Sequence, residues 1–145
     1  MGDKSKVTVA GQLAREPEMK YMDSGGEMIA RTVVSIATNR KYRGVEEVTW
    51  HRITFWGDLA ETVNKWCQKG TVVMTEGRLT PDPETGGPRV WHDERDGTWK
   101  ASYEVTAWEI TFLANLRPKP ESTGLFDGGT TQIGDLDDIP ELSFD

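Results

Sequence analysis

The sequence predicts an all-β fold, a small barrel of five antiparallel strands with one short helix between the third and fourth strands. Three observations predict it. Five separate stretches alternate apolar and polar residues with the two-residue period of a β-strand. A glycine or a polar turn signal interrupts the pattern between most of them. Only one stretch, directly after the third predicted strand, carries apolar residues at helical spacing.

The first predicted strand covers residues 6–13, where Gly11 indicates a bulge or bend. Pro17 and its neighbours interrupt the alternation, and residues 18–21 are a candidate extension of the same strand. Residues 23–26 have the Asp-Ser-Gly-Gly composition of a hairpin turn. The chain is therefore expected to reverse here and to enter a second strand.

The second strand is predicted over residues 28–38, which are rich in β-branched side chains. Residues 39–44 are expected to form a basic loop that carries one aromatic side chain. The third strand is predicted over residues 48–56, where the alternation resumes.

A short amphipathic helix of about three turns is predicted after Gly57, which breaks the strand pattern. Asp58 and Glu61 resemble a capping box with Asp58 as the N-cap, and Gly70 is expected to end the helix. The residues that share one helical face are Leu59, Val63, Trp66 and Cys67. Trp66 and Cys67 are therefore interpreted as packing residues rather than as part of a reactive site.

The fourth strand is predicted over residues 71–80, where Gly77 indicates a bend, and the fifth over residues 99–112, with a long polar connection at 81–98 between them. Three strands, one helix and two strands are the order of the OB-fold, a five-stranded Greek-key barrel. That barrel binds oligonucleotides with its strands two and three and with its first and last long loops. In this chain those regions are residues 28–56 and the connection at 81–98.

The stretch from Trp50 to Trp56 has an unusual distribution of side chains for a strand. Ile53 and Phe55 would share one face and have an ordinary core signature, while both tryptophans would share the other face with Arg52. A guanidinium between two exposed π-faces suits phosphates and stacked bases. The alternative is that both tryptophans belong to the core and that Arg52 reaches past them to solvent.

Two further clusters combine aromatic and basic residues. Tyr42 lies among Arg40, Lys41 and Arg43, and Trp91 lies between Arg89 and Arg95. Trp50 and Trp56 would be about 20 Å apart along a strand, so each would stack on a different nucleotide. The face that carries these two tryptophans has no Asn or Gln, so the sequence offers no obvious donor for reading base edges.

The composition suits one soluble domain with an appendage, because the 145 residues are 36% hydrophobic and 28% charged. The net charge of −7 divides into −2 for residues 1–116 and −5 for residues 117–145, so nucleic-acid binding would depend on local basic clusters. We expect neither a membrane span nor a signal peptide, because no apolar run is long enough. Cys67 is the only cysteine, which excludes an internal disulfide and fits the cytoplasm.

No catalytic or metal-binding pattern is recognisable in the sequence. The two histidines and the single cysteine are not at metal-ligand spacing, and no phosphate loop or nucleophile elbow is present. The acid pairs at 46–47 and 93–94 are interpreted as solvated loop charges. His51 is interpreted as a packing or interface residue, and His92 as a loop residue without a partner. We therefore predict no enzymatic activity, no metal, no cofactor and no small-molecule substrate.

The domain boundary is predicted at residue 116, with residues 117–145 forming a disordered linker and an acidic tip. The last eleven residues contain five acids and no base, with apolar residues between them. Such a tip is more typical of a short docking peptide than of a purely solvating tail. The predicted docking residues are Asp137, Asp138, Ile139, Pro140 and Phe144.

Over residues 7–113 the sequence resembles the bacterial-type single-stranded-DNA-binding proteins almost continuously. The motifs that carry the resemblance are Val9-Ala10-Gly11-Gln12-Leu13, Pro17, Tyr21-Met22, Gly25-Gly26, Trp50-His51-Arg52, Phe55-Trp56-Gly57, Leu59-Ala60-Glu61, Lys69-Gly70 and Glu76-Gly77-Arg78-Leu79. The resemblance implies an OB-fold homotetramer that wraps single-stranded DNA without sequence preference. It also implies work in replication, recombination and repair near the nucleoid, with the tail recruiting partner proteins.

The resemblance also implies roles for particular residues. It places base stacking on Trp50 and Trp56, and less directly on Tyr42 and Trp91, with Arg52 contacting the DNA backbone or bases. His51 would lie near a subunit interface. The basic residues included in the expected DNA-binding set are Arg40, Lys41 and Arg43 around Tyr42, together with Lys6, Arg15 and Lys69 as phosphate contacts.

Three features depart from the pattern of the family. Asp58 stands where relatives often carry a lysine, which weakens the basic lining beside Trp56. The connection at 81–98 is long, so its DNA contacts could be rearranged. The tail continues for five residues beyond Pro140 and ends in Asp145, whereas the family usually ends in Pro-Phe.

The sequence thus favours a non-enzymatic binder of single-stranded DNA. Two alternatives stay open at this point. One is an OB-fold accessory protein that binds RNA or acts in a primosome, and the other is a barrel that serves as a protein-interaction scaffold.

Overall fold

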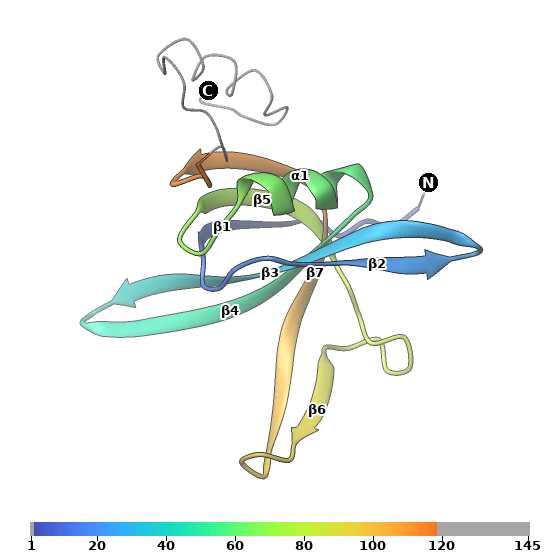
Figure 1. Cartoon of the computed structure of the whole chain (residues 1–145). Helices are drawn as coiled ribbons and strands as arrows, with labels where there is room; N and C mark the ends of the chain where they lie inside the picture. The colour runs from blue at the N-terminus through green and yellow to red at the C-terminus, as the bar shows by residue number, and fades with distance from the viewer. Residues whose placement is uncertain (1, 119–145) are drawn as a thin grey trace, which may run out of the picture.

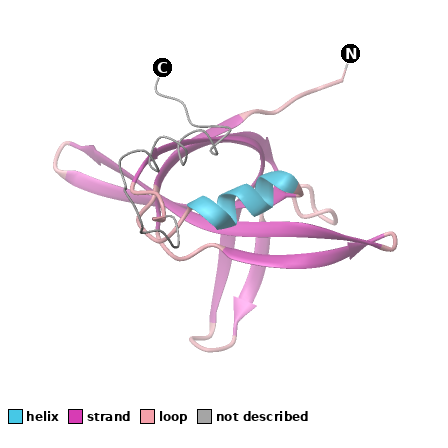
Figure 2. Cartoon of the chain, turned by 45° about the horizontal axis from the view of Figure 1, so that its top comes forward, coloured by secondary structure: helices cyan, strands magenta, loops and turns pink. Residues whose placement is uncertain are grey.

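Five strands close a barrel, and the first of them pairs at both ends of the ring. The order around the barrel is β1 (Val7–Leu13), β5 (Val72–Leu79), β7 (Thr98–Ala114), β4 (Val45–Trp56) and β3 (Glu27–Tyr42). Strand β1 also pairs with β3, which completes the circle. This computed structural model describes residues 2–118 and confirms the predicted all-β barrel with one short helix (Figures 1 and 2).

Three hairpins extend beyond the barrel, so the molecule has arms as well as a closed body (Figure 1). Strand β2 (Glu18–Ser24) pairs with β3, and β6 (Arg89–Asp93) pairs with β7. The third arm is formed by the distal halves of β3 and β4. Residues 18–24 therefore form a strand of their own rather than an extension of β1.

The sequence predicts an antiparallel sheet, but one pair of strands in the barrel is parallel. Strands β4 and β7 run parallel, with Ile53 opposite Val105 in their register. The helix, β5 and β6 lie between these two strands in the sequence, and this long crossover is what allows a parallel pair. The predicted order of the five barrel strands and the helix is right, and the predicted antiparallel direction of the β4–β7 pair is wrong.

The predicted basic loop at residues 39–44 is mostly strand. Strand β3 continues to Tyr42 and β4 begins at Val45, which leaves Arg43 and Gly44 as a two-residue turn. Both turn residues have positive φ values, 51° and 80°, as tight hairpin turns between twisted strands require. The connection at 81–98 likewise contains β6, so Trp91 lies on a strand and only residues 81–88 and 94–97 are loop or turn.

Helix α1 (Asp58–Trp66) begins differently from the predicted capping box. Gly57 is the N-cap residue, no side chain caps the helix, and Asp58 is already helical. The carboxylate of Glu61 instead accepts a hydrogen bond from the Tyr21 hydroxyl at 3.1 Å. The helix ends before an extended Cys67, and Gly70 serves the following loop, where its N–H donates to the Leu13 carbonyl at 2.8 Å. Within residues 2–118 no helix is both long and apolar enough to cross a membrane.

The core lies inside the barrel and under α1. Ile53 and Phe55 of β4 are completely buried in it, and so is Cys67, while Trp66 is almost completely buried, which confirms their prediction as packing residues. The hydroxyl of Thr32 donates to the Ala60 carbonyl at 2.7 Å and so fixes the helix against β3. Because Ile53 and Phe55 point into the core, the residues of β4 that alternate with them point outward, and the candidate site lies on that outer face.

Candidate nucleic-acid interface

The outer face of β4 is the first part of the candidate interface. Trp50 and Trp56 expose 53% and 43% of their surface, whereas Ile53 and Phe55 on the same strand are fully buried. Strand alternation produces this division, because successive side chains point to opposite sides of the sheet. The prediction of two exposed tryptophans is confirmed, and the alternative that both are core residues is wrong.

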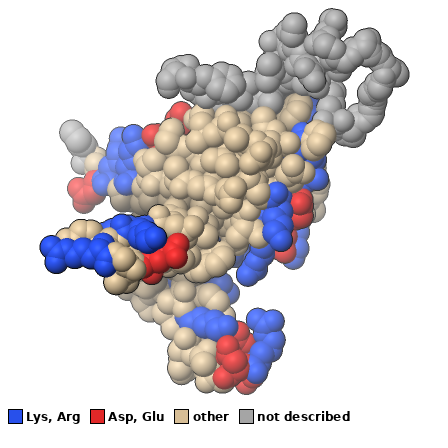
Figure 3. Space-filling view, turned by 90° about the vertical axis from the view of Figure 1, so that its left-hand side faces the viewer, with Lys and Arg blue, Asp and Glu red and all other residues tan. Residues whose placement is uncertain are grey.

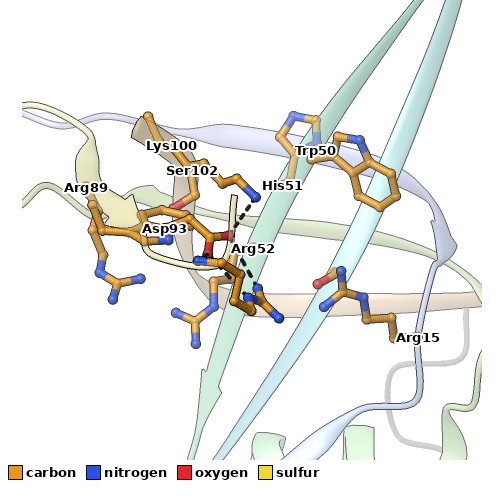
Figure 4. A pocket seen from close by; sticks show the side chains of 12 residues that line it. Arg15, Trp50, His51, Arg52, Arg89, Asp93, Lys100 and Ser102 are labelled. Carbon is orange, nitrogen blue, oxygen red and sulfur yellow. Dashed lines mark hydrogen bonds and ion pairs between the residues drawn. The ribbon is translucent and has the colours of Figure 1, made fainter. Parts of the chain in front are cut away.

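A groove of about 710 Å³ lies between the middle of β4 and the β6–β7 arm (Figure 4). It brings together four residues of the expected DNA-binding set, Arg15, Trp50, Arg52 and Trp91, and His51 also lines it. Figure 4 shows Trp50 and Arg15 on one side, with Arg89, Asp93 and Lys100 on the other. Residues from three distant segments of the chain therefore face one shared space.

Strand register explains which side chains of the β6–β7 arm enter the groove. Arg89, Trp91 and Asp93 are alternate residues of β6 and share a face. Lys100 stands opposite Trp91, and Ser102 stands opposite Arg89. The sequence analysis missed Asp93, Lys100 and Ser102 as site residues. Only the pairing of β6 with β7 identifies them, and the sequence indicated a loop over residues 81–98 instead of a strand.

Asp93 is the structural centre of the β6–β7 side of the groove. Its side chain is only 8% exposed, and Lys100 Nζ donates to its Oδ2 at 2.7 Å. The backbone N–H and the Nε of Arg95 donate to its Oδ1 at 3.0 and 3.3 Å. These bonds, with Lys100 as the larger cause, hold the pKa of Asp93 well below its usual range. Its interpretation as a solvated loop charge was wrong, since it is a buried anchor for two cations.

Glu104 plays a similar part at the junction of β4 and β7. Its side chain is 11% exposed, and its Oε1 lies 3.4 Å from Arg52 Nη1. Its Oε2 lies 4.0 Å from Arg89 Nη1 and accepts a hydrogen bond from the Ser102 hydroxyl at 2.6 Å. One carboxylate thus holds two arginines that come from opposite walls of the groove.

The charge of the groove differs in sign from that of the whole chain. The basic residues that line it are Arg15, Arg52, Arg89, Arg95 and Lys100, and the only acid among the lining residues is Asp93. Figure 3 shows the β6–β7 arm at the bottom of the view, where basic and acidic side chains are intermixed. A phosphate chain entering here would meet a local excess of cations although the full sequence carries −7.

The predicted cluster around Tyr42 lies at the tip of the β3–β4 arm and outside the groove. The guanidinium carbons of Arg40 and Arg43 lie 5.6 and 5.2 Å from the centre of the Tyr42 ring. Arg40 also pairs with Glu47 at 3.6 Å, while Lys41 is exposed beside them. The arm therefore presents an exposed aromatic ring between two cations, on the strands that lead to Trp50.

The three residues predicted as phosphate contacts are divided between two places. Arg15 lines the groove. Lys6 lies outside it and pairs with Glu76 of β5 at 3.5 Å. The backbone N–H of Lys69 donates to Glu16 at 3.0 Å, which places Lys69 beside the loop that carries Arg15. That bond, followed by the contact with Arg117, lowers the pKa of Glu16.

The two histidines occupy different environments. His51 is half-buried, its ring centre is 6.2 Å from that of Tyr103, and its shielded Nδ1 has no hydrogen-bond partner within the part of the chain that the structure describes. Its position at a subunit interface stays a prediction. His92 does have partners, contrary to expectation, because it packs edge-on against Trp99 at 5.1 Å and its Nδ1 lies 3.1 Å from Glu94 Oε2.

The reactive groups of the described region are few. Among residues 2–118 no three His, Cys, Asp or Glu side chains are placed to hold a metal ion. The thiol of Cys67 is buried, and burial raises its pKa to about 12, so it is not a nucleophile at neutral pH. The aromatic rings and basic side chains of the groove suit the binding of stacked bases and phosphates. The predicted docking residues at 137–144 lie outside the described residues.

Comparison with known proteins gives a consistent result. Residues 4–113 match the model of the single-strand binding protein family. A single-stranded DNA-binding protein of Xanthomonas campestris pv. campestris is 34% identical over 114 residues, which is 75% of this chain and 60% of the relative. A protein of the same name from Neisseria meningitidis serogroup A is 32% identical over 111 residues, 75% of this chain and 59% of the relative.

A shorter relative covers more of the chain. The single-stranded DNA-binding protein 2 of a Nostoc species is 31% identical over 128 residues, which is 88% of this chain and 91% of the relative. The chain thus spans about three-fifths of the Xanthomonas and Neisseria relatives and nearly the whole of the Nostoc relative.

Proposed function

Because the chain belongs to the single-strand binding protein family, we propose that it binds single-stranded DNA through the outer face of β4 and the groove beside the β6–β7 arm. The observation that carries this proposal is the groove itself. It places the rings of Trp50 and Trp91 in one space with five basic side chains. Stacking surfaces beside a cationic path are the usual means of holding a single strand.

Base stacking would supply the contacts to the nucleotides. Each base that stacks on an aromatic ring contributes on the order of 1–3 kcal/mol, whatever the base. Trp50 on β4 and Trp91 on β6 would hold bases inside the groove. Trp56 lies about 20 Å further along β4 and would hold another nucleotide. Arg89 lies 5.0 Å over the Trp91 ring, so a stacked base there would have a cation next to it.

The cations would supply the contacts to the phosphates. Arg52 and Arg89 share Glu104, and Arg95 and Lys100 share Asp93. These almost buried carboxylates restrict where the cations can go, which reduces the ordering cost when a phosphate arrives. Side-chain amides are absent from the lining of the groove, so the contacts favour the backbone over base identity.

The wider role follows from this binding mode and from the family. We propose that the protein protects single-stranded DNA in replication, recombination and repair as a cytoplasmic homotetramer that is not an enzyme. His51 would lie at the contact between subunits. The acidic tip at 137–144 would recruit other DNA-maintenance proteins. The exposed cluster around Tyr42 would extend the DNA path along the β3–β4 arm.

The proposal is tested by binding of fluorescein-labelled oligothymidine and oligouridine of equal length, followed by anisotropy. We expect tight binding of the DNA by the full chain and binding weakened by about five-fold or more in Trp50→Ala, since one lost stack costs about 1–3 kcal/mol. The matched control is Trp99→Ala, because Trp99 is exposed on the β6–β7 arm and does not line the groove. Equal or better binding of the RNA would instead favour an RNA-binding accessory protein.

A further inference from the structure

A second basic surface lies beside Trp56, away from the groove. Strands β2, β3 and β4 are neighbours in the sheet, and their registers place Lys20 opposite Arg31 and Arg31 opposite Trp56. Directly opposed residues of antiparallel strands project from the same face, with Cβ atoms about 4.5–5.5 Å apart. Lys20, Arg31 and Trp56 therefore form one row across three strands, named here the β2–β4 row.

The cations of the β2–β4 row are not committed to acids. Within residues 2–118 neither Lys20 nor Arg31 forms an ion pair, whereas four of the five cations of the groove do. Lys20 is exposed. Arg31 is half-buried, and its shielded Nε has no hydrogen-bond partner among the described residues. A guanidinium that has no acid partner can pair with a bound anion instead.

The β2–β4 row and the groove belong to one continuous face. Between Trp56 and Trp50 the outward residues of β4 are Thr54 and Arg52, and their partners on β3 are Val33 and Ser35. No acid lies on these two strands between the row and the groove. The acids nearest to the row in sequence or register are Glu18, which stands opposite Val33 on β2, and Asp58, which follows Gly57.

We propose that Lys20 and Arg31 bind the phosphates that flank a nucleotide stacked on Trp56, so that the single strand leaves the groove, follows β4 and crosses onto the β2–β3 arm. The proposal rests on the proposed binding of single-stranded DNA. Arg31 is suited to this role because its planar guanidinium donates several N–H groups to one phosphate, and Lys20 adds a mobile point charge beside it. Figure 1 shows β2, β3 and β4 side by side, with the β2–β3 arm extending past the end of β4.

The test measures oligothymidine affinity as a function of salt for the full chain and for Lys20→Gln, Arg31→Gln and the double variant. Loss of one phosphate contact should reduce the magnitude of the slope of log K against log salt by about 0.7. The loss of affinity relative to the full chain should therefore be about five-fold larger at 0.1 M salt than at 1 M salt. The double variant should lose about twice that slope. Lys65→Gln is the matched control, because Lys65 is an exposed lysine on α1, outside this face.

A second measurement separates a local contact from a general loss of charge. Arg31→Gln, Trp56→Ala and the double variant form a cycle, in which a shared nucleotide predicts a combined loss smaller than the product of the two single losses. Arg31→Lys should keep most of the salt slope. Unfolding temperatures measured without DNA establish that each variant is folded, and Lys20→Gln changes only an exposed side chain.

Unchanged slopes for both Lys20→Gln and Arg31→Gln, in a protein that binds DNA, would overturn this inference and leave the proposed function intact. An equal loss of slope in Lys65→Gln would overturn it as well, because the effect would then be general electrostatics. Failure of the unaltered chain to bind oligothymidine would instead reject the proposed function.

Discussion

At the scale of single residues, two almost buried carboxylates explain how a strongly acidic chain presents a basic groove. Asp93 holds Lys100 and Arg95, and Glu104 holds Arg52 and Arg89. The sequence identified the tryptophans and Arg52, because strand alternation alone separates them from the core. It could not identify Asp93 or Glu104, because their role depends on which strands become neighbours.

Replacing Asp93 tests its role as an anchor. Asp93→Asn should lower the unfolding temperature at neutral pH, because the amide cannot form charge-assisted bonds to Lys100 and Arg95. The folded-state pKa of Asp93 is depressed, so its contribution is fully present above the ordinary aspartate value of about 3.9 and is lost as pH falls through the lower folded pKa.

Thermal melts of the two proteins at several pH values measure this effect. The difference in unfolding temperature should be constant from pH 7 down to about pH 5 and shrink below about pH 3.9. A difference that persists undiminished at pH 2 would contradict the account. Glu94→Gln is a suitable control, because Glu94 is the neighbouring carboxylate and is exposed at the start of the β6–β7 turn.

At the scale of elements, the parts of the fold that pack against the core and the turn of the β2–β3 arm were predictable, and the other two arms were not. Strands β1, β5 and the middle of β4 bury alternate residues, which leaves a clear two-residue period in the sequence. The distal half of the β3–β4 arm and most of β6 are exposed on both faces, so no hydrophobic period marks them as strands. The start of α1 was misjudged because Gly57 with positive φ takes the position expected for Asp58.

The fourth predicted strand does contain the bend that its glycine indicated. Gly77 lies where the β5–β7 register shifts, and a Cβ there would collide with the backbone of Thr106 and Ala107. Gly77→Ala should therefore destabilise the barrel by about 1–3 kcal/mol or more, since rigid backbone must move. Urea unfolding measures this, with Gly87→Ala as control because a Cβ at Gly87 meets only ordinary contacts. Equal midpoints for the two variants would refute the close approach.

At the scale of the whole molecule, charge is divided between a near-neutral body and an acidic tail. Residues 1–116 carry a net −2 and residues 117–145 carry −5, and a linear sequence count is sufficient to show this. What composition could not show is that five basic residues of the body line one groove, since they come from β4, β6, the β6–β7 turn, β7 and the loop after β1. Strand pairing alone brings them together.

Deleting residues 135–145 removes five acids and no base. If the tail competes with DNA for the groove, the shortened chain should bind oligothymidine more tightly, with the largest gain at low salt where charges are least screened. Anisotropy titrations at about 20 mM and 300 mM salt measure the difference, which should vanish at the higher value because the Debye length is then short. Equal affinities at low salt would remove the competition.

The central claim is that exposed tryptophans beside a cationic groove hold single-stranded DNA. Tryptophan fluorescence of the full chain, titrated with oligothymidine at two salt concentrations, tests it most directly. Stacking on Trp50, Trp56 and Trp91 predicts strong quenching that saturates at a fixed number of nucleotides per chain and weakens as salt rises. Fluorescence that stays unchanged at micromolar protein and excess DNA would contradict the account.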